Sequence, residues 1–417
     1  MKILHTVESY TPTVNGMQEV VKQISENLVK LGHNVTIATK KNTLRKENII
    51  NGVKIVDFDI SGNFSSGLKG EIEEYKNFVL RSDFDIVTNF AAQQWATDIL
   101  LPILPQIKAK KVFVPTGFSG FYIPQFREYF ENMKQWMKNY DMNVFLSYDY
   151  RDINFAKQNN ITKNIVIPNG ANKEEFLKNY KIDIRKKLNI SQNHFLILNV
   201  SSHTGLKGHI EAIKIFEKAK IKDCTFVIAG NTLETTKNKL KLKQILKKII
   251  FFILNKKIST GCSQICIDNM QKFNSSKKRK TDDKRLIVSS FTREETVCLY
   301  QQSDLFLFPS NIECSPIVLF EAMASQTPFL VTDVGNSKEI IDWSQGGMLL
   351  PTKIDKKGYS KVDINKASKI LTNIYYNKEI LNKLKKSGFN SWLENFSWEK
   401  ISKDYEKMYC KLLGVKC

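Results

Sequence analysis

Residues 304–324, DLFLFPSNIECSPIVLFEAMA, form a strand–loop–helix pattern that indicates the fold class. The apolar run Leu305–Phe308 predicts a buried strand, and the apolar spacing over Ser315–Ala324 predicts a helix packed on a sheet. Pro316 suits the first turn of that helix. Glu313 lies in the loop between them, at the carboxyl end of the strand, where open α/β sheets bind ligands. The stretch therefore predicts one repeat of an α/β fold, with an acid at its ligand edge.

Glu321 is the unusual residue of this stretch, because it lies among Leu, Phe, Ala and Met of the predicted helix. A buried carboxylate is unfavourable unless a partner compensates for its lost hydration. Two interpretations follow from the spacing alone. Glu313 and Glu321 belong to one ligand site, or Glu313 is a surface acid and Glu321 is a buried acid paired with an Arg, a Lys or a backbone amide.

Strands and helices alternate on both sides of this stretch. The first half contains a helix over 17–31 that ends at Gly32, and the second contains helices over 208–220, 294–302 and 366–386. This alternation predicts parallel, doubly wound sheets of the α/β class. The predicted strands are 2–7, 35–39, 54–58, 85–90, 112–114, 143–146 and 165–167, then 195–200, 225–229, 286–288, 305–308, 329–332 and 348–350.

The chain of 417 residues suits two domains of about 200 residues each. We expect an N-terminal domain at 1–170 and a C-terminal domain at 190–390. The final helix, about 398–413, is expected to pack back on the first domain. Apolar residues make up 42% and charged residues 25% of the chain, which is typical of a globular protein.

A basic insertion, 231–285, interrupts the second domain where a few residues usually suffice. Its segment 237–257 contains eight lysines and no acid, arranged around apolar residues at helical spacing. A basic amphipathic helix is typical of membrane-surface binding. The alternative is a helix docked on its own domain with a solvated lysine face, and the spacing does not separate the two.

The net charge of +21 indicates an anionic partner, whether nucleic acid, an anionic membrane face or a charged small substrate. The chain has no zinc-finger or RNA-recognition pattern, so we expect no nucleic-acid partner. No apolar run approaches the roughly 20 residues that span a bilayer, and the N-terminus lacks the features of a signal peptide. The scattered cysteines fit a reducing compartment. We expect a cytoplasmic protein, peripheral on the inner face of the cell membrane if 237–257 binds lipid.

Two glycine-containing loops follow predicted strands and precede helices. Gly16 leaves free N–H groups at the start of the first helix, a natural anion site. In the second domain, Ser202 and His203 lead to Lys207-Gly208, and the lysine there would suit a pyrophosphate. Each loop taken alone is also compatible with an ordinary helix start.

The sequence indicates no metal site. Cys262 and Cys266 lie four residues apart, but no second Cys or His pair follows at zinc spacing. Asp57-Phe58-Asp59 and Asp83-Phe84-Asp85 each offer two acids, which alone make a poor magnesium site and more often form turns.

Several ordered motifs recur along the chain: Val166-Ile167-Pro168-Asn169-Gly170, Lys207-Gly208, Glu313 through Glu321 with Ala322-Met323-Ala324, Asp333-Val334-Gly335 and Glu339. Together they resemble the retaining nucleotide-sugar glycosyltransferases of the GT-B fold, specifically glycosyltransferase family four. The resemblance covers nearly the whole chain except 231–285, and it implies two Rossmann-like domains facing a central cleft.

The resemblance implies a reaction and a role for each matched residue. A sugar would move from a nucleotide diphosphate-sugar to a glycan or lipid-linked acceptor with retention and without metal, in cell-surface polysaccharide or glycoconjugate biosynthesis. Glu313 would contact the sugar, Glu321 the ribose and Lys207 the diphosphate; Glu313 and Lys207 would be catalytic. The donor-binding residues would be Gly16, Ser202, His203, Lys207, Glu313, Cys314, Ser315 and Glu321.

The chain departs from the family pattern at three places. Ser202 stands where an arginine is usual, with His203 as its substitute. Pro115-Thr116-Gly117 replaces a loop that often contains a histidine, and Gln326 replaces a common glycine. These departures motivate the alternative of a non-catalytic GT-B partner subunit in a glycosyltransferase complex.

Overall fold

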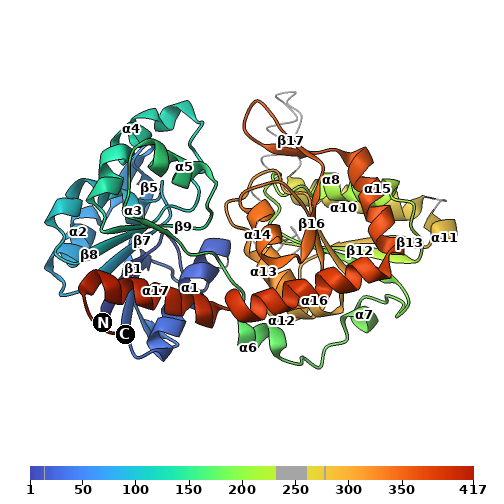
Figure 1. Ribbon diagram of the computed structural model, residues 1–417, viewed down its shortest axis with the longest axis horizontal. Coiled ribbons are helices and arrows are strands. Elements are labelled where there is room, and N and C mark those ends of the chain that lie inside the picture. Colours follow the sequence, from blue (N-terminus) through green and yellow to red (C-terminus); the bar gives the residue numbers. More distant parts are fainter. Residues whose placement is uncertain (14, 232–260, 277–278) are drawn as a thin grey trace. The chain divides into compact units, whose positions relative to one another are not determined.

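The computed structural model describes residues 1–13, 15–231, 261–276 and 279–417 (Figure 1). The predicted basic helix at 237–257 lies outside the described residues. The chain divides into two compact units. Unit 1 contains Met1–Lys173, Glu313–Ile317 and Leu393–Cys417, and unit 2 contains Glu174–Ile312 and Val318–Trp392.

Unit 1 is built on an eight-stranded sheet with the order β10-β9-β8-β7-β1-β2-β4-β3. All neighbours pair in parallel except β3 with β4. The sheet strands are β1 (Lys2–Thr6), β2 (Asn34–Lys40), β3 (Ile49–Ile50), β4 (Val53–Phe58), β7 (Ile86–Phe90), β8 (Lys110–Val114), β9 (Met142–Phe145) and β10 (Asn164–Val166). A separate hairpin, β5 (Ile60–Asn63) with β6 (Gly67–Gly70), was not predicted.

Alternate residues of these strands enter two different cores, so the sheet is buried on both faces. Ile3 and Ile86 belong to one core, while their neighbours Leu4 and Val87 belong to the other. This is why the strands read as continuous apolar runs. The helices of unit 1 are α1 (Gly16–Lys30), α2 (Ile72–Arg81), α3 (Trp95–Asp98), α4 (Arg127–Trp136), α5 (Arg151–Gln158) and α17 (Trp398–Leu413).

Helix α17 packs beside α1, and Figure 1 draws the two helices side by side. Its residues Ile401, Tyr405 and Tyr409 enter the same core as Val21 and Ile24 of α1. After Gly414, which adopts a left-handed conformation, the tail turns back and Cys417 forms a disulfide with Cys410. The scattered spacing of the cysteines had favoured unpaired thiols, because it does not reveal this turn.

Unit 2 is built on a six-stranded parallel sheet with the order β13-β12-β11-β14-β15-β16. This is the doubly wound order, in which the chain starts in the middle and reverses direction beside the first strand. The predicted α/β class is therefore confirmed. The strands are β11 (Phe195–Val200), β12 (Cys224–Ala229), β13 (Lys284–Ser289), β14 (Leu305–Phe308), β15 (Phe329–Thr332) and β16 (Gly347–Leu350), with a separate hairpin of β17 (Thr352–Ile354) and β18 (Ser360–Val362).

One face of this sheet is covered by α8 (His209–Lys218), α10 (Cys262–Ser275) and α15 (Ile364–Tyr376), which share one core. The single helix predicted over 366–386 is wrong, because the chain forms α15 and then α16 (Lys378–Asn395). Asn377 leaves the helical conformation and its side chain accepts a hydrogen bond from the Ile380 N–H at 3.0 Å, which starts the new helix. The other helices are α6 (Lys173–Leu177), α7 (Ile184–Lys187), α11 (Arg279–Asp282), α12 (Arg293–Gln302), α13 (Ile317–Ala324) and α14 (Ser337–Ser344).

Among the described residues, no helix is long and apolar enough to cross a membrane.

Candidate functional site

The carboxyl edge of the unit 2 sheet brings two predicted loops together. Strands β11 and β14 are neighbours at the point where the strand order reverses, and ligands of doubly wound sheets bind at that point. The loop 201–208 follows β11, and the loop beginning at Pro309 follows β14. The loop that contains Lys207 therefore lies at the expected ligand edge of its sheet.

These two loops are joined by the backbone. The Asn311 N–H donates a hydrogen bond to the Leu206 carbonyl at 2.9 Å. Gly208 has a φ of 70°, and a Cβ atom there would lie 1.8 Å from the Pro309 carbonyl oxygen. Only glycine allows this approach. Lys207 is half-buried and lies just before α8, between Leu206 and Gly208, which the loop after β14 holds in place.

Two further side chains support the same edge from later strands. Thr332, at the end of β15, donates a hydrogen bond to the Ser310 carbonyl at 2.5 Å. Lys361 on β18 donates to the Asn311 side-chain oxygen at 3.1 Å. Lys361 gives this edge a second cation, which the sequence reasoning missed because nothing in the spacing relates β18 to the loop after β14.

Glu321 is buried on α13, as predicted, with 4% of its surface exposed. Its Oε1 atom lies 2.8 Å from Nη2 of Arg293, the first residue of α12. Arg293 also donates two hydrogen bonds of 2.7 Å to the Glu175 carboxylate. Burial opposes the charge of Arg293, but the two carboxylates raise its pKa well above the usual value. The partner that a buried acid requires is therefore Arg293, which the sequence reasoning did not identify.

The segment Glu313–Ile317 packs within unit 1, although it follows a strand of unit 2 in the sequence. The Asn169 side chain of the Pro-Asn-Gly segment donates a hydrogen bond to the Ser315 carbonyl at 2.9 Å. A Cβ atom on Gly117 would lie 2.7 Å from Cys314 Cβ, so Gly117 makes close contact with that residue possible. Glu313 itself is half-buried.

The loop after β8 is conformationally strained. Thr116, Gly117 and Phe118 have consecutive positive φ angles of 61°, 94° and 49°, which non-glycine residues rarely adopt. Asp152 accepts a hydrogen bond from the Gly117 N–H at 2.8 Å, and burial raises the pKa of this carboxyl to about 6. Strain of this kind persists where surrounding structure enforces it, often at functional sites.

The Gly16 loop of unit 1 ends in a capped helix start. Asn15 accepts a hydrogen bond from the Gln18 N–H at 3.0 Å, so one of the free N–H groups at this end of α1 already has a partner. Gly16 lies within ordinary contact distance of Ile317, at 4.0 Å from an ideal Cβ to Cδ1.

The two acid-x-acid pairs have partners within unit 1. Asp57 forms an ion pair with Arg45, and Asp83 forms one with Lys2. Asp85 accepts a hydrogen bond from the Lys2 N–H at 2.7 Å. These contacts favour the interpretation of the pairs as turn and ion-pair residues.

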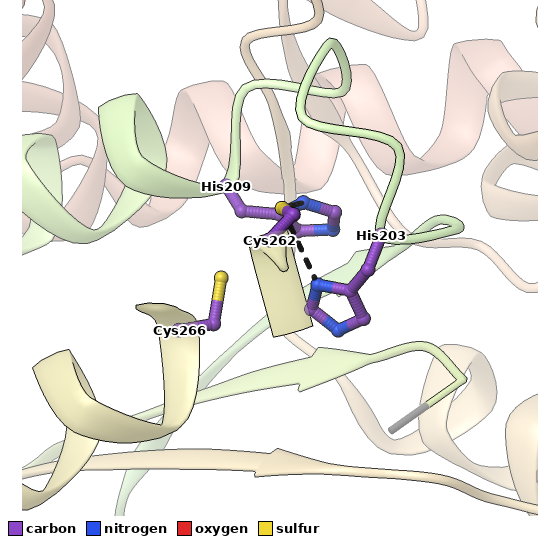
Figure 2. A group of neighbouring side chains, drawn as sticks. All are labelled: His203, His209, Cys262 and Cys266. Atoms are coloured by element: carbon purple, nitrogen blue, oxygen red, sulfur yellow. Dashed lines mark hydrogen bonds between the residues drawn. The ribbon is translucent and has the colours of Figure 1, made fainter. Parts of the chain in front are cut away.

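The structure brings His203 and His209 to Cys262 and Cys266 (Figure 2). The Nδ1 atoms of the two imidazoles lie 3.7 Å and 3.6 Å from Cys262 Sγ. Burial lowers the pKa of both histidines, that of His209 to about 3, so the rings are neutral. The side chain of His203 is directed at a thiol. The sequence reasoning set the cysteines aside because their histidine partners lie more than fifty residues away.

Comparisons with known proteins agree with the resemblance predicted from the motifs. The family described as Glycosyl transferases group 1 matches residues 268–361. An uncharacterized glycosyltransferase of Methanocaldococcus jannaschii is 22% identical over 438 residues, which cover 98% of each chain.

Two solved structures are also similar. Sucrose-phosphate synthase from Thermosynechococcus elongatus has a TM-score of 0.73 at 16% identity over 99% of each chain. Anabaena HepE in complex with UDP and glucose has a TM-score of 0.70 at 13% identity, over 99% of this chain and 100% of that one. The protein has the GT-B fold, as predicted, and it resembles the group 1 glycosyltransferases.

Proposed function

We propose that this protein is a glycosyltransferase that takes its sugar from a nucleoside diphosphate-sugar. The observation that supports this best is the placement of Lys207. The contacts of Leu206 and Gly208 with the loop after β14 hold it at the carboxyl edge of the unit 2 sheet, where the strand order reverses. The match to the group 1 family and the fold of a UDP-binding neighbour support the same proposal.

The site residues act as follows in this proposal. Lys207 and the first N–H groups of α8 stabilise the negative charge that develops on the departing diphosphate. Glu321, which is paired with Arg293, binds the ribose. Glu313, with the backbone amides near Cys314 and Ser315, contacts the sugar hydroxyls, and the Gly16 loop approaches the donor. His203 receives no anion-binding role, because its Nδ1 atom faces Cys262.

The finer assignment follows the resemblance to family four. We propose transfer of a hexosyl group with retention, without a metal ion in the transfer step, to a glycan or lipid-linked acceptor. The acceptor hydroxyl then attacks on the face from which the diphosphate departs. The product would belong to cell-surface polysaccharide or glycoconjugate biosynthesis, and the protein would work in the cytoplasm.

The decisive experiment measures donor binding by Lys207→Ala with Lys214→Ala as a matched control. Lys214 is an exposed lysine on the same helix. Wild-type protein is first screened by thermal shift against UDP-, GDP- and ADP-sugars. Loss of a charge-assisted contact should weaken binding of the preferred donor by about 10- to 100-fold in Lys207→Ala. Equal affinities of both variants and the wild type would contradict the proposal.

The absence of an arginine at Ser202, with His203 turned toward Cys262, favours one alternative. In that alternative, the chain binds the donor as a non-catalytic partner subunit. Product formation by the purified chain, measured with a labelled donor, separates the two. Transfer or hydrolysis that Glu313→Gln abolishes supports the enzyme, whereas donor binding with neither reaction supports the subunit.

A further inference from the structure

We propose that His203, His209, Cys262 and Cys266 bind a structural Zn²⁺ ion in unit 2. The four candidate ligand atoms lie within 4.8 Å of one another (Figure 2). Two thiolates and two imidazoles form a common ligand set of structural zinc sites. Among the described residues, no other group of His, Cys, Asp and Glu converges in this way.

The separations of the two Nδ1 atoms from Cys262 Sγ fit a tetrahedral zinc ion. Zinc–nitrogen bonds of about 2.0 Å and zinc–sulfur bonds of about 2.3 Å give nitrogen–sulfur separations of about 3.6 Å in a tetrahedron. The separations from Cys262 Sγ to the two Nδ1 atoms are 3.7 Å and 3.6 Å. The longest separation in the group would shorten by about 1 Å on binding, since the edges of such a tetrahedron are about 3.4 to 3.8 Å.

Local structure explains why the four side chains converge. Cys262 and Cys266 lie four residues apart at the start of α10, so they share one face of that helix. His209 is the first residue of α8, and His203 lies in the loop before it. Cys266 and His209 are buried. The two imidazole rings stack with centroids 4.3 Å apart, which keeps both rings beside the sulfur atoms.

A chain of hydrogen bonds fixes the tautomer of His209. The Asn199 amide donates to the Leu307 carbonyl at 2.7 Å, which leaves its oxygen to accept from the Ser201 hydroxyl at 2.8 Å. Ser201 Oγ is therefore free to accept from His209 Nε2–H, also at 2.8 Å. The proton on Nε2 leaves the lone pair of Nδ1 directed toward the cysteines. This outer contact is the arrangement that orients a metal-binding histidine.

His203 offers the same side of its ring. Its Nε2 atom is buried and has no hydrogen-bond partner in the part of the chain that the structure describes. Its Nδ1 atom faces Cys262. The alternative of a cysteine nucleophile with a histidine base uses only two of the four groups and leaves the second thiol and the second imidazole unexplained.

The ion would have a structural role, because four protein ligands complete a tetrahedral shell and leave no position for substrate or water. It would join the loop 201–208 to the beginning of α10. Binding replaces the two thiol protons by the metal, and both protons go to solvent. No oxidation or reduction takes place. The inference does not depend on the proposed activity, because metal content is measured without a sugar donor.

The first test uses the wild-type chain, purified under reducing conditions without chelator. Elemental analysis should find about one zinc per chain. After zinc removal, added Co²⁺ should give the intense visible absorption of tetrahedral cobalt with thiolate ligands. Wild-type protein that contains less than about a tenth of an equivalent of zinc and gives no such cobalt spectrum would overturn the proposal.

Variants test whether these side chains are the ligands. Cys266→Ser should lose the bound zinc, whereas Cys298→Ser, a buried cysteine on α12 outside the group, should retain it. Ser201→Ala removes the acceptor for His209 and the hydroxyl that donates to Asn199, but none of the four ligands, so it should fold and yet bind zinc about 10- to 100-fold more weakly. Zinc affinity unchanged in both Cys266→Ser and Ser201→Ala would contradict the assignment even if wild-type protein contains the metal.

Discussion

Each unit contains a buried histidine, His5 on β1 of unit 1 and His209 at the start of α8 of unit 2, and the two histidines have different partners. His5 on β1 contacts the Ser25 hydroxyl at 2.7 Å and the Tyr409 hydroxyl at 3.2 Å. His209 contacts one hydroxyl, that of Ser201, and the thiol of Cys262. Burial lowers the pKa of both histidines to about 3.

The comparison shows that burial and pKa do not reveal the role of a histidine. Hydroxyl groups both donate and accept, so His5 is fully satisfied by protein atoms. A thiol is a weak donor and a weak acceptor. The Nδ1 atom of His209 would therefore be better satisfied by a metal ion that the thiols also bind. Four predictions, in order of decreasing effect, test how these buried groups are satisfied.

Removal of zinc should give the largest difference in stability between unit 2 and unit 1. A ligand at about 1,000 times its Kd stabilises a fold by about 4 kcal/mol. A strong chelator should therefore lower the free energy of local unfolding of the loop 201–208 and α10 by an amount of that order. The α1 and β1 amides of unit 1 should be unaffected. Hydrogen exchange with and without chelator measures both regions in one sample. Equal effects in the two units would contradict the proposed difference.

Glu321→Ala extends the comparison from neutral to charged groups. Loss of the Glu321 carboxylate should cost about 1.5 to 3 kcal/mol, because it removes a charged hydrogen-bond partner of Arg293, whose side chain is 42% exposed and keeps its bonds to Glu175. Glu175→Ala is the matched control, since Glu175 is 21% exposed against 5% for Glu321. The control should cost about 1 kcal/mol or less. Urea unfolding of the three proteins checks the order, and equal losses would contradict it.

Tyr409→Phe tests the neutral network around His5. The Tyr409 hydroxyl contacts His5 at 3.2 Å and Thr88 at 2.7 Å, so its removal should cost about 1 to 3 kcal/mol. In Tyr10→Phe, the lost hydroxyl has no hydrogen-bond partner among the described residues, and the stability should stay the same or rise. Thermal unfolding of both variants measures the difference. If Tyr10→Phe lost as much stability as Tyr409→Phe, the hydrogen-bond network around His5 would make no contribution to stability.

The pH dependence of unit 1 gives the smallest effect. The pKa of His5 is about 3 in the fold and about 6.5 in an unfolded chain, so the unfolded chain binds more protons between these values. Acidification from pH 6.5 to 5.5 should therefore cost about 1 kcal/mol through His5.

Two buried carboxyls of unit 1 act in the opposite direction. The pKa values of Asp98 and Asp152 are raised to about 6 by burial, so both groups stabilise the fold as the pH falls toward 4. His5→Gln should remove only the destabilising part. When the pH falls from 6.5 to 5.5, the stability of the variant should therefore increase by about 1 kcal/mol relative to that of the wild type, as hydrogen exchange of unit 1 at both pH values can measure. An identical pH dependence would contradict the burial of a neutral His5.

Much of the fold could be predicted, because parallel strands buried on both faces appear as short apolar runs between helices. The places where this regular alternation breaks could not be predicted. The helix boundary at Asn377 depends on one side chain capping the next helix, and the hairpin β5–β6 has no clear alternation of apolar residues. Neither feature produces a strong period in the sequence.

Periodicity, motif order and the cost of a buried charge are local properties, so they are enough to predict the α/β class, the family resemblance and the need of Glu321 for a partner. The neighbours of these residues follow only from the folded arrangement. It paired Glu321 with Arg293, placed Lys207 at the switch point of a sheet, and brought two histidines to two cysteines more than fifty residues away. Strand order and helix packing determine such neighbours, and neither is encoded in the spacing of the residues involved.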